Sequence, residues 1–204
     1  MSISNVTPGL TPKDWPGFLT DILPRQGNWS DEEYLVLTEQ TNRLVEFTDG
    51  FLEELPMPTE RHQAMVEYLF DEFRAYIKPR GGKARFAPLR LQIRPGKYRE
   101  PDILLVLSLS DPRRQDRFWR GADLAIEVVS PDKPERDLVE KPADYAEGGV
   151  QEYWIVNPID ETISVLRLGG ATYVEAGMYR RGDAASSVLL PGFSLDVAAV
   201  FEAE

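Results

Sequence analysis

The sequence predicts an α/β (α+β) protein in which helices flank a β-sheet. Three apolar runs, at residues 102–107, 124–129 and 153–156, have the length and composition of buried strands. Apolar residues repeat with helical spacing over residues 59–77, and a second helical segment follows the run at 124–129. The predicted order is helix, hairpin, helix, three strands, helix, strand and then further strands.

Length and composition bound the organisation of the chain. With 204 residues, 42% of them hydrophobic, it can bury one substantial core. We expect an N-terminal arm over residues 1–29, rich in Pro, Gly and Asn, and a single domain over residues 30–204. The absence of cysteine excludes disulfides, thiolate zinc sites and thiol nucleophiles. No apolar run approaches the roughly 20 residues of a membrane span, so we expect a cytoplasmic protein without membrane contact.

Two local signals place the first elements of the domain. Ser30 and Glu33 have the spacing of a capping box, which predicts a short helix through Glu39. The pair Asp49-Gly50 lies between two short apolar runs, and this pattern predicts a β-hairpin because glycine readily adopts positive φ. Glu46 lies within the hairpin.

A long helix follows from Thr59. Its apolar residues recur every three or four positions until Pro79 and two glycines end it. They are Met65, Val66, Leu69, Phe70, Phe73, Tyr76 and Ile77. His62, the only histidine, falls in the first turn, where a capping or solvent-facing role is more common than catalysis.

Strands dominate the rest of the chain. Leu89, Leu91 and Ile93 alternate with polar residues, the period of a strand with one buried face. After the run at 153–156, extended segments at 162–168, 171–179 and 187–190 predict a meander or lateral sheet. These C-terminal strands are an addition to the central sheet.

Two carboxylates interrupt the apolar strand runs and point to chemistry. Asp102 opens one run and Glu127 lies inside the next, where an ionised group is costly without a partner. A divalent metal such as Mg²⁺, or Mn²⁺, bound between neighbouring strands would provide that partner, because Mg²⁺ needs only one or two carboxylates. Lys141, in the following helical segment, is the cation placed to share the site. A structural role for either carboxylate, as a cap or a group bonded to backbone amides, is the alternative.

Several of these motifs together resemble one family. They are Pro101-Asp102, the run Glu127 to Pro131, Arg136-Asp137, Lys141, Tyr145, Gly149-Val150 and the run Glu152 to Val156. As a set they resemble the Uma-type family of putative restriction endonucleases, a branch of the PD-(D/E)XK nuclease superfamily. The resemblance extends to Glu46, His62 and the segment Pro191 to Phe193, so it covers most of the chain.

The resemblance implies a restriction-endonuclease-like core with a mixed central sheet. It also implies that Asp102 and Glu127 are metal ligands and that the activity is metal-dependent hydrolysis of DNA, in an enzyme that acts as a homodimer. The superfamily places its lysine two residues after the acid, where this chain has Val129. The family resemblance selects Lys141 instead.

Further residues are candidates for accessory roles. Asp137, Lys141 and Tyr145 are spaced by four and would share a helix face, although Pro142 favours a helix start near that position. The alternative for these residues is a surface ion pair beside a packed tyrosine. Glu46 and His62 are further accessory candidates.

The distribution of charge along the chain bears on whether the protein binds nucleic acid. The net charge of −11 argues against general affinity for nucleic acid, but residues 81–120 hold ten Lys and Arg against four Asp and Glu. Solvated strand edges and a polar loop explain this excess as well as a phosphate-binding rim does.

Other functions remain as alternatives to a nuclease. A nuclease fold without catalysis, kept as a DNA-binding or interaction module, is consistent with the acidic balance and with Val129. Glycoside hydrolysis by two carboxylates is less well supported, because apolar strands beside a lysine suit a metal better. A Ser-His-Asp or Cys-His mechanism lacks a nucleophile motif.

Overall fold

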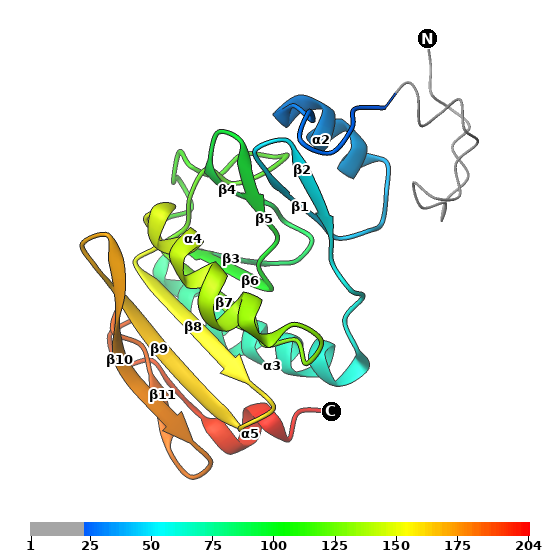
Figure 1. Ribbon diagram of the computed structural model, residues 1–204. Coiled ribbons are helices and arrows are strands. Elements are labelled where there is room, and N and C mark those ends of the chain that lie inside the picture. Colours follow the sequence, from blue (N-terminus) through cyan, green and yellow to red (C-terminus); the bar gives the residue numbers. More distant parts are fainter. Residues whose placement is uncertain (1–22) are drawn as a thin grey trace.

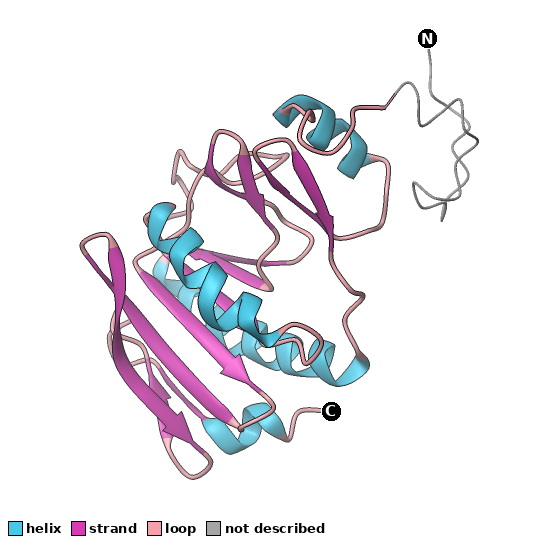
Figure 2. Cartoon of the chain, viewed as in Figure 1, coloured by secondary structure: helices cyan, strands magenta, loops and turns pink. Residues whose placement is uncertain are grey.

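The computed structural model describes residues 23–204, and these residues form an α+β fold with a mixed sheet between helices (Figure 1; Figure 2). Helices α3 (Glu60–Ile77) and α5 (Val197–Phe201) lie on one face of the main sheet, and α4 (Lys141–Glu147) crosses the other. The predicted fold class is confirmed. Most of the predicted N-terminal arm, residues 1–22, lies outside the described residues.

The main sheet has six strands among the described residues. In spatial order they are β10 (Thr172–Arg180), β9 (Thr162–Gly169), β8 (Glu152–Asn157), β7 (Leu124–Val128), β6 (Ile103–Val106) and β3 (Lys83–Phe86). Only β7 and β8 of this sheet pair in parallel, and α4 lies in the crossover that a parallel pair requires. The sheet is therefore mixed, as predicted.

Alternation along the central strands gives the sheet a core on each face. On β6, Ile103 and Leu105 pack toward α3, whereas Leu104 and Val106 pack toward α4. The apolar runs are continuous because both faces are covered. Ala125 of β7 and Val129, directly after β7, belong to the α4 side, so Glu127 between them points to that side as well.

A smaller sheet lies beside the main one. Its strands are β2 (Phe51–Glu54), β1 (Val45–Thr48), β5 (Lys97–Arg99) and β4 (Leu91–Arg94). The predicted hairpin is β1–β2, and its turn residues Asp49 and Gly50 have φ values of 46° and 89°. Helix α2 (Asp31–Glu39) packs on this sheet through Tyr34, and its predicted capping box between Ser30 and Glu33 is present.

One predicted strand is wrong. Residues 187–190 form a turn rather than a strand, and the strands nearby are β11 (Ala184–Ser186) and β12 (Ser194–Asp196). The buried carboxylate of Glu152 explains the turn, because it accepts hydrogen bonds from the backbone N–H groups of Val188 and Leu189 at 2.7 Å each. Those groups are therefore not available to a ladder.

Two helix starts position functional side chains. Thr59 caps α3 by accepting a hydrogen bond from the backbone N–H of His62, which fixes His62 in the first turn. Helix α4 begins at Lys141, one residue before Pro142, and follows the π-helical turn η2 (Arg136–Glu140). The start near Pro142 is as predicted, with Asp137 on the approach. Within residues 23–204, no helix combines the length and apolarity needed to cross a membrane.

Candidate functional site

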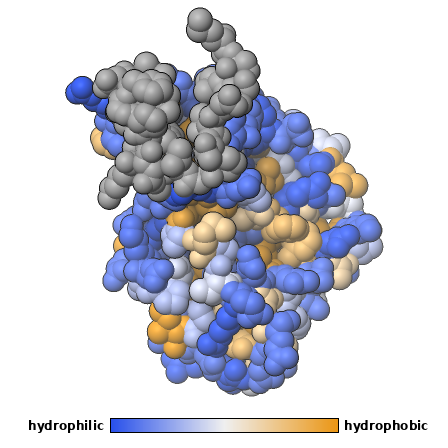
Figure 3. Space-filling model, turned by 90° about the vertical axis from the view of Figure 1, so that its right-hand side faces the viewer, coloured by the Kyte–Doolittle hydropathy of each residue, from blue (hydrophilic) through white to orange (hydrophobic). Residues whose placement is uncertain are grey.

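A cavity of about 630 Å³ opens where β6 and β7 meet the first turn of α3. Its floor carries charged and polar side chains from several elements. They are His62, Asp102, Glu127, Asp137 and Lys141. Its walls are largely apolar and include Met57, Phe70 and Phe86. Figure 3 shows hydrophobic residues gathered in the middle of one side of the molecule and bordered by hydrophilic ones.

Asp102 and Glu127 lie opposite each other at the end of an antiparallel strand pair. The register pairs Ile103 with Ile126, and one further step, to the residue before β6 and the next residue of β7, sets Asp102 against Glu127. Residues paired in this way have Cβ atoms about 5 Å apart and project from the same face. Asp102 Oδ2 also accepts a hydrogen bond from the backbone N–H of Val128 at 2.8 Å.

Glu127 is almost fully buried, with 2% of its surface exposed. Its Oε1 atom lies 2.9 Å from Lys141 Nζ and also accepts a hydrogen bond from the hydroxyl of Tyr145. Burial raises the pKa of the Glu127 carboxyl to about 8; Lys141 opposes this rise, and the charges of Asp102 and Asp137 add to it. The protein therefore holds a carboxyl group that keeps its proton more readily than usual.

Lys141 bridges two acids on the cavity floor. Its Nζ atom lies 2.9 Å from Glu127 Oε1 and 2.9 Å from Asp137 Oδ1. Burial by itself would lower the pKa of Lys141, but the surrounding carboxylates, Glu127 foremost, raise it above the usual value, so the ammonium form persists. Asp137 is held in turn by the backbone N–H of Ser130 at 3.0 Å.

His62 reaches the same point from α3. Its Nε2 atom lies 3.3 Å from Asp102 Oδ2 and 3.2 Å from the carbonyl oxygen of Val128. Both neighbours are acceptors, so Nε2 carries a proton. Burial works to lower the pKa of His62, but the interaction with Asp102 outweighs it and raises the pKa. The pKa of Asp102 is lowered, because His62 and Lys141 together outweigh the effect of burial.

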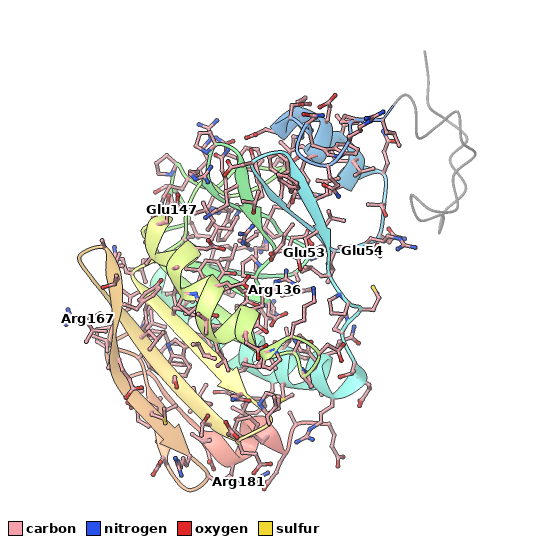
Figure 4. The ribbon with its side chains drawn as sticks, in the orientation of Figure 1. Glu53, Glu54, Arg136, Glu147, Arg167 and Arg181 are labelled. Atoms are coloured by element: carbon pink, nitrogen blue, oxygen red, sulfur yellow. The ribbon has the colours of Figure 1, made fainter. Side chains whose placement is uncertain are left out.

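Glu46 belongs to a neighbouring ion-pair cluster and does not line the cavity. Its Oε2 atom lies 2.7 Å from Arg136 and 3.5 Å from Arg99. Burial would raise the pKa of Glu46, but Lys141, Arg136 and Arg99 hold it below the usual value. In Figure 4, Arg136 lies between the helical segment and the hairpin, near Glu53, to which an ion pair at 3.8 Å joins it.

Asp102 and Glu127 leave carboxylate oxygens available for a cation. The side-chain hydrogen bonds and ion pairs described for Asp102 within residues 23–204 use Oδ2, and those described for Glu127 use Oε1. In that part of the chain, no group of three or more His, Asp or Glu side chains is arranged to hold a metal. The carboxylates of Asp102 and Glu127 lie on the cavity floor, with the Val128 carbonyl nearby. This oxygen set suits Mg²⁺ or Mn²⁺, which completes its shell with water.

The structure brings most of the predicted residues together. Direct interactions join Asp102 to His62, Lys141 to both Glu127 and Asp137, and Tyr145 to Glu127. Val129, at the usual lysine position of the superfamily, is buried in the core on the α4 side.

Sequence reasoning missed Glu100 and Arg136 as site residues. Glu100 lines the cavity, and burial raises the pKa of its carboxyl to about 8. Its position two residues before Asp102 was the available signal. Arg136 belonged to the run that carried the family resemblance, but nothing local indicated that it would bind Glu46.

Comparison with known proteins places the chain among nuclease-like folds. The family model Uma2, described as "Putative restriction endonuclease", matches residues 31–198. A solved structure described as a putative nuclease belonging to DUF820, from Anabaena variabilis ATCC 29413, is 21% identical in sequence. It superposes with a TM-score of 0.70 over 85% of this chain and 97% of that chain, a likeness of fold. A search of curated proteins finds no match.

Proposed function

Because the chain belongs to the Uma2 family of putative restriction endonucleases, we propose that it is a metal-dependent nuclease that hydrolyses phosphodiester bonds of DNA. Asp102 and Glu127 are the proposed ligands of Mg²⁺ or Mn²⁺, and Lys141 is the proposed catalytic cation. The observation that carries the proposal is that Asp102, directly before β6, and Glu127, on β7, continue the β6–β7 register, with the buried ammonium group of Lys141 2.9 Å from Glu127.

The metal would supply a polarised phosphoryl oxygen and an acidified water molecule when bound. Glu127 becomes a better ligand once it loses the proton that burial favours, so metal binding and proton release from its carboxyl are coupled. Lys141, held by Asp137, keeps a positive charge beside Glu127, where it can stabilise negative charge developing on the phosphate. Tyr145 fixes the orientation of Glu127 through its hydroxyl.

His62 acts in this proposal as a positioning residue. Its Nε2–H group binds the oxygen of Asp102 that faces the α3 turn, which leaves the other oxygen for the cation. Arg136 and Glu46 hold η2 against the smaller sheet and so support the helix that carries Lys141. The predicted homodimer stays a prediction, which the mass of the protein in solution checks.

A cleavage assay tests the proposal. Supercoiled and linear DNA are incubated with Mg²⁺ or Mn²⁺ and either the wild type, Glu127→Gln or Lys141→Ala. The control is Glu175→Gln, which makes the same acid-to-amide change at an exposed position on β10. We expect cutting by the wild type and the control, no cutting in EDTA, and at least a hundredfold loss in both site variants.

Two outcomes would overturn the proposal. Cutting that survives both site substitutions would contradict the assigned roles. DNA binding by the folded wild type without any cutting would favour the second candidate, a nuclease-fold module without catalysis. This second candidate is favoured by Val129, which is buried at the position where the superfamily has its lysine.

A further inference from the structure

A second hollow, of about 510 Å³, adjoins the candidate site along the edge of the main sheet. It lies between α3 and β3, and β3 is an edge strand among the described residues. Phe70 and Phe86 line both this hollow and the cavity above the acids. The two spaces are therefore neighbours that share one aromatic wall.

The second hollow is basic. Four cations, Arg74, Lys78, Lys83 and Arg85, line it together with apolar residues and a glycine, and no carboxylate does. We call these four residues the basic groove. Within residues 23–204, Lys78, Lys83 and Arg85 form no ion pair with a carboxylate, and Arg74 has only Asp71 at 3.9 Å. The pKa of Lys83 is lowered, chiefly by the neighbouring charge of Arg85, which agrees with crowded positive charges.

Six of the other cations in the basic stretch at residues 81–120 form ion pairs with carboxylates. They are Arg90, Arg94, Lys97, Arg99, Arg113 and Arg117. These six cations therefore add no unpaired charge to a phosphate-binding rim, which was one of the two interpretations of this stretch. In a protein of net charge −11, the uncompensated charge of the basic groove is a local attraction for an anion.

The shared wall offers an aromatic surface to a ligand. Phe86 is 54% exposed, and its ring meets Phe70 edge-on, with centroids 4.8 Å apart and an interplanar angle of 80°. Met57, also strongly exposed, lines the same cavity. Aromatic side chains beside a positively charged groove are typical of sites that bind single-stranded nucleic acid, where bases stack and phosphates meet cations.

We propose that the basic groove and Phe86 bind an unpaired DNA strand and lead it into the site of Asp102 and Glu127. Phosphates beyond the reacting one contact Lys83 and Arg85, and a base stacks on the exposed ring of Phe86. A base inside a duplex is already stacked on its neighbours, so this surface favours single-stranded or locally opened DNA. The inference rests on the proposed function and names the form of its substrate.

Binding in EDTA tests the groove without cleavage. Fluorescence anisotropy measures the affinity of a labelled oligothymidine and of a labelled duplex for the wild type, Phe86→Ala and the double variant Lys83→Ala/Arg85→Ala. The matched control is Arg167→Ala/Arg180→Ala, which removes two exposed charges from β9 and β10 at the opposite edge of the sheet. Figure 4 shows Arg167 on that distant edge.

We expect the wild type and the control to bind the single strand more tightly than the duplex. The double variant should lose about tenfold or more in affinity for the single strand. The slope of log affinity against log salt should fall by roughly 1.4, since each phosphate contact to a single strand contributes about 0.7. Phe86→Ala should weaken single-strand binding about tenfold and leave the salt slope unchanged.

The proposal is overturned if the double variant binds the single strand like the wild type, if the control loses as much, or if the duplex binds as tightly as the single strand. Unchanged melting temperatures establish that the variants are folded. The two proposals fail separately. Metal-dependent cutting that requires Glu127 but not the basic groove would support the proposed function and contradict the groove proposal. DNA binding that requires the basic groove, without any cutting, would support the groove proposal and contradict the proposed function.

Discussion

Ionisation of Glu127 is costly, because its carboxyl is buried beside other acids. This carboxyl shares the ammonium group of Lys141 with Asp137, and Asp102 lies across from it, directly before β6. Two acids compete for one cation, so protonation of Glu127 relieves repulsion as well as the cost of burial. A divalent cation bound by Asp102 and Glu127, as proposed, would remove the same repulsion.

The raised pKa of Glu127 makes stability depend on pH. In the unfolded chain this carboxyl ionises near its ordinary value of 4.5, whereas in the folded protein it ionises near 8. Between these pH values the folded state binds one proton more than the unfolded state. The free energy of unfolding therefore falls by about 1.4 kcal/mol, through Glu127, for each unit by which the pH rises in this window. We expect Glu127→Gln to remove this contribution, so that the variant gains stability relative to the wild type as pH rises from 5 to about 8.

Urea unfolding at several pH values, in EDTA, measures the effect. Glu100 has a pKa raised to about the same value, so part of the wild-type slope should remain in the variant. A difference between the wild type and Glu127→Gln that is constant from pH 5 to pH 8 would mean that Glu127 is ionised throughout.

At the scale of elements, Glu152 links a strand to a distant turn. Its buried carboxylate accepts hydrogen bonds from Trp154 Nε1, Ser187 Oγ and the backbone N–H groups of Val188 and Leu189. These interactions attach the segment before β12 to the start of β8. The turn at residues 187–190 therefore depends on a residue far away in the sequence.

Replacement of Glu152 should release that turn. We expect Glu152→Ala to lower the free energy of unfolding by on the order of 3 kcal/mol, because several donors lose a charged acceptor at once. Hydrogen exchange should become faster at the amides of Val188 and Leu189, with Glu175→Gln as the exposed control. Unchanged protection of those two amides would contradict the assigned role of Glu152.

The same elements show what sequence could and could not predict. The strands β6, β7 and β8 were predicted because burial on both faces leaves continuous apolar runs, and α3 because one face is core. The turn at 187–190 was mistaken for a strand because its backbone partners belong to Glu152, which local pattern does not reveal. The sequence also did not indicate that β1 pairs with β5, because the two segments are about fifty residues apart.

Across the whole molecule, the candidate site draws on parts that are distant in sequence. Asp102 and Glu127 stood out as acids in apolar runs, but their opposition depends on the register of β6 and β7. His62 was an accessory candidate at a position where capping or solvent exposure is more common, and it lies half-buried against Asp102 from α3. Spacing by four correctly placed Asp137 beside Lys141. Sequence thus named the candidates, and the three-dimensional fold decides which of them meet.

Calorimetric titration with Mn²⁺ tests the central claim that Asp102 and Glu127 together hold a divalent cation. The wild type and Glu175→Gln, kept at pH 8 to favour ionised Glu127, should each bind one Mn²⁺ ion per chain in this site. Asp102→Asn should bind it at least tenfold more weakly, a difference of about 1.4 kcal/mol. Binding of Mn²⁺ by folded Asp102→Asn with the affinity of the wild type, or no binding by the wild type, would contradict the claim.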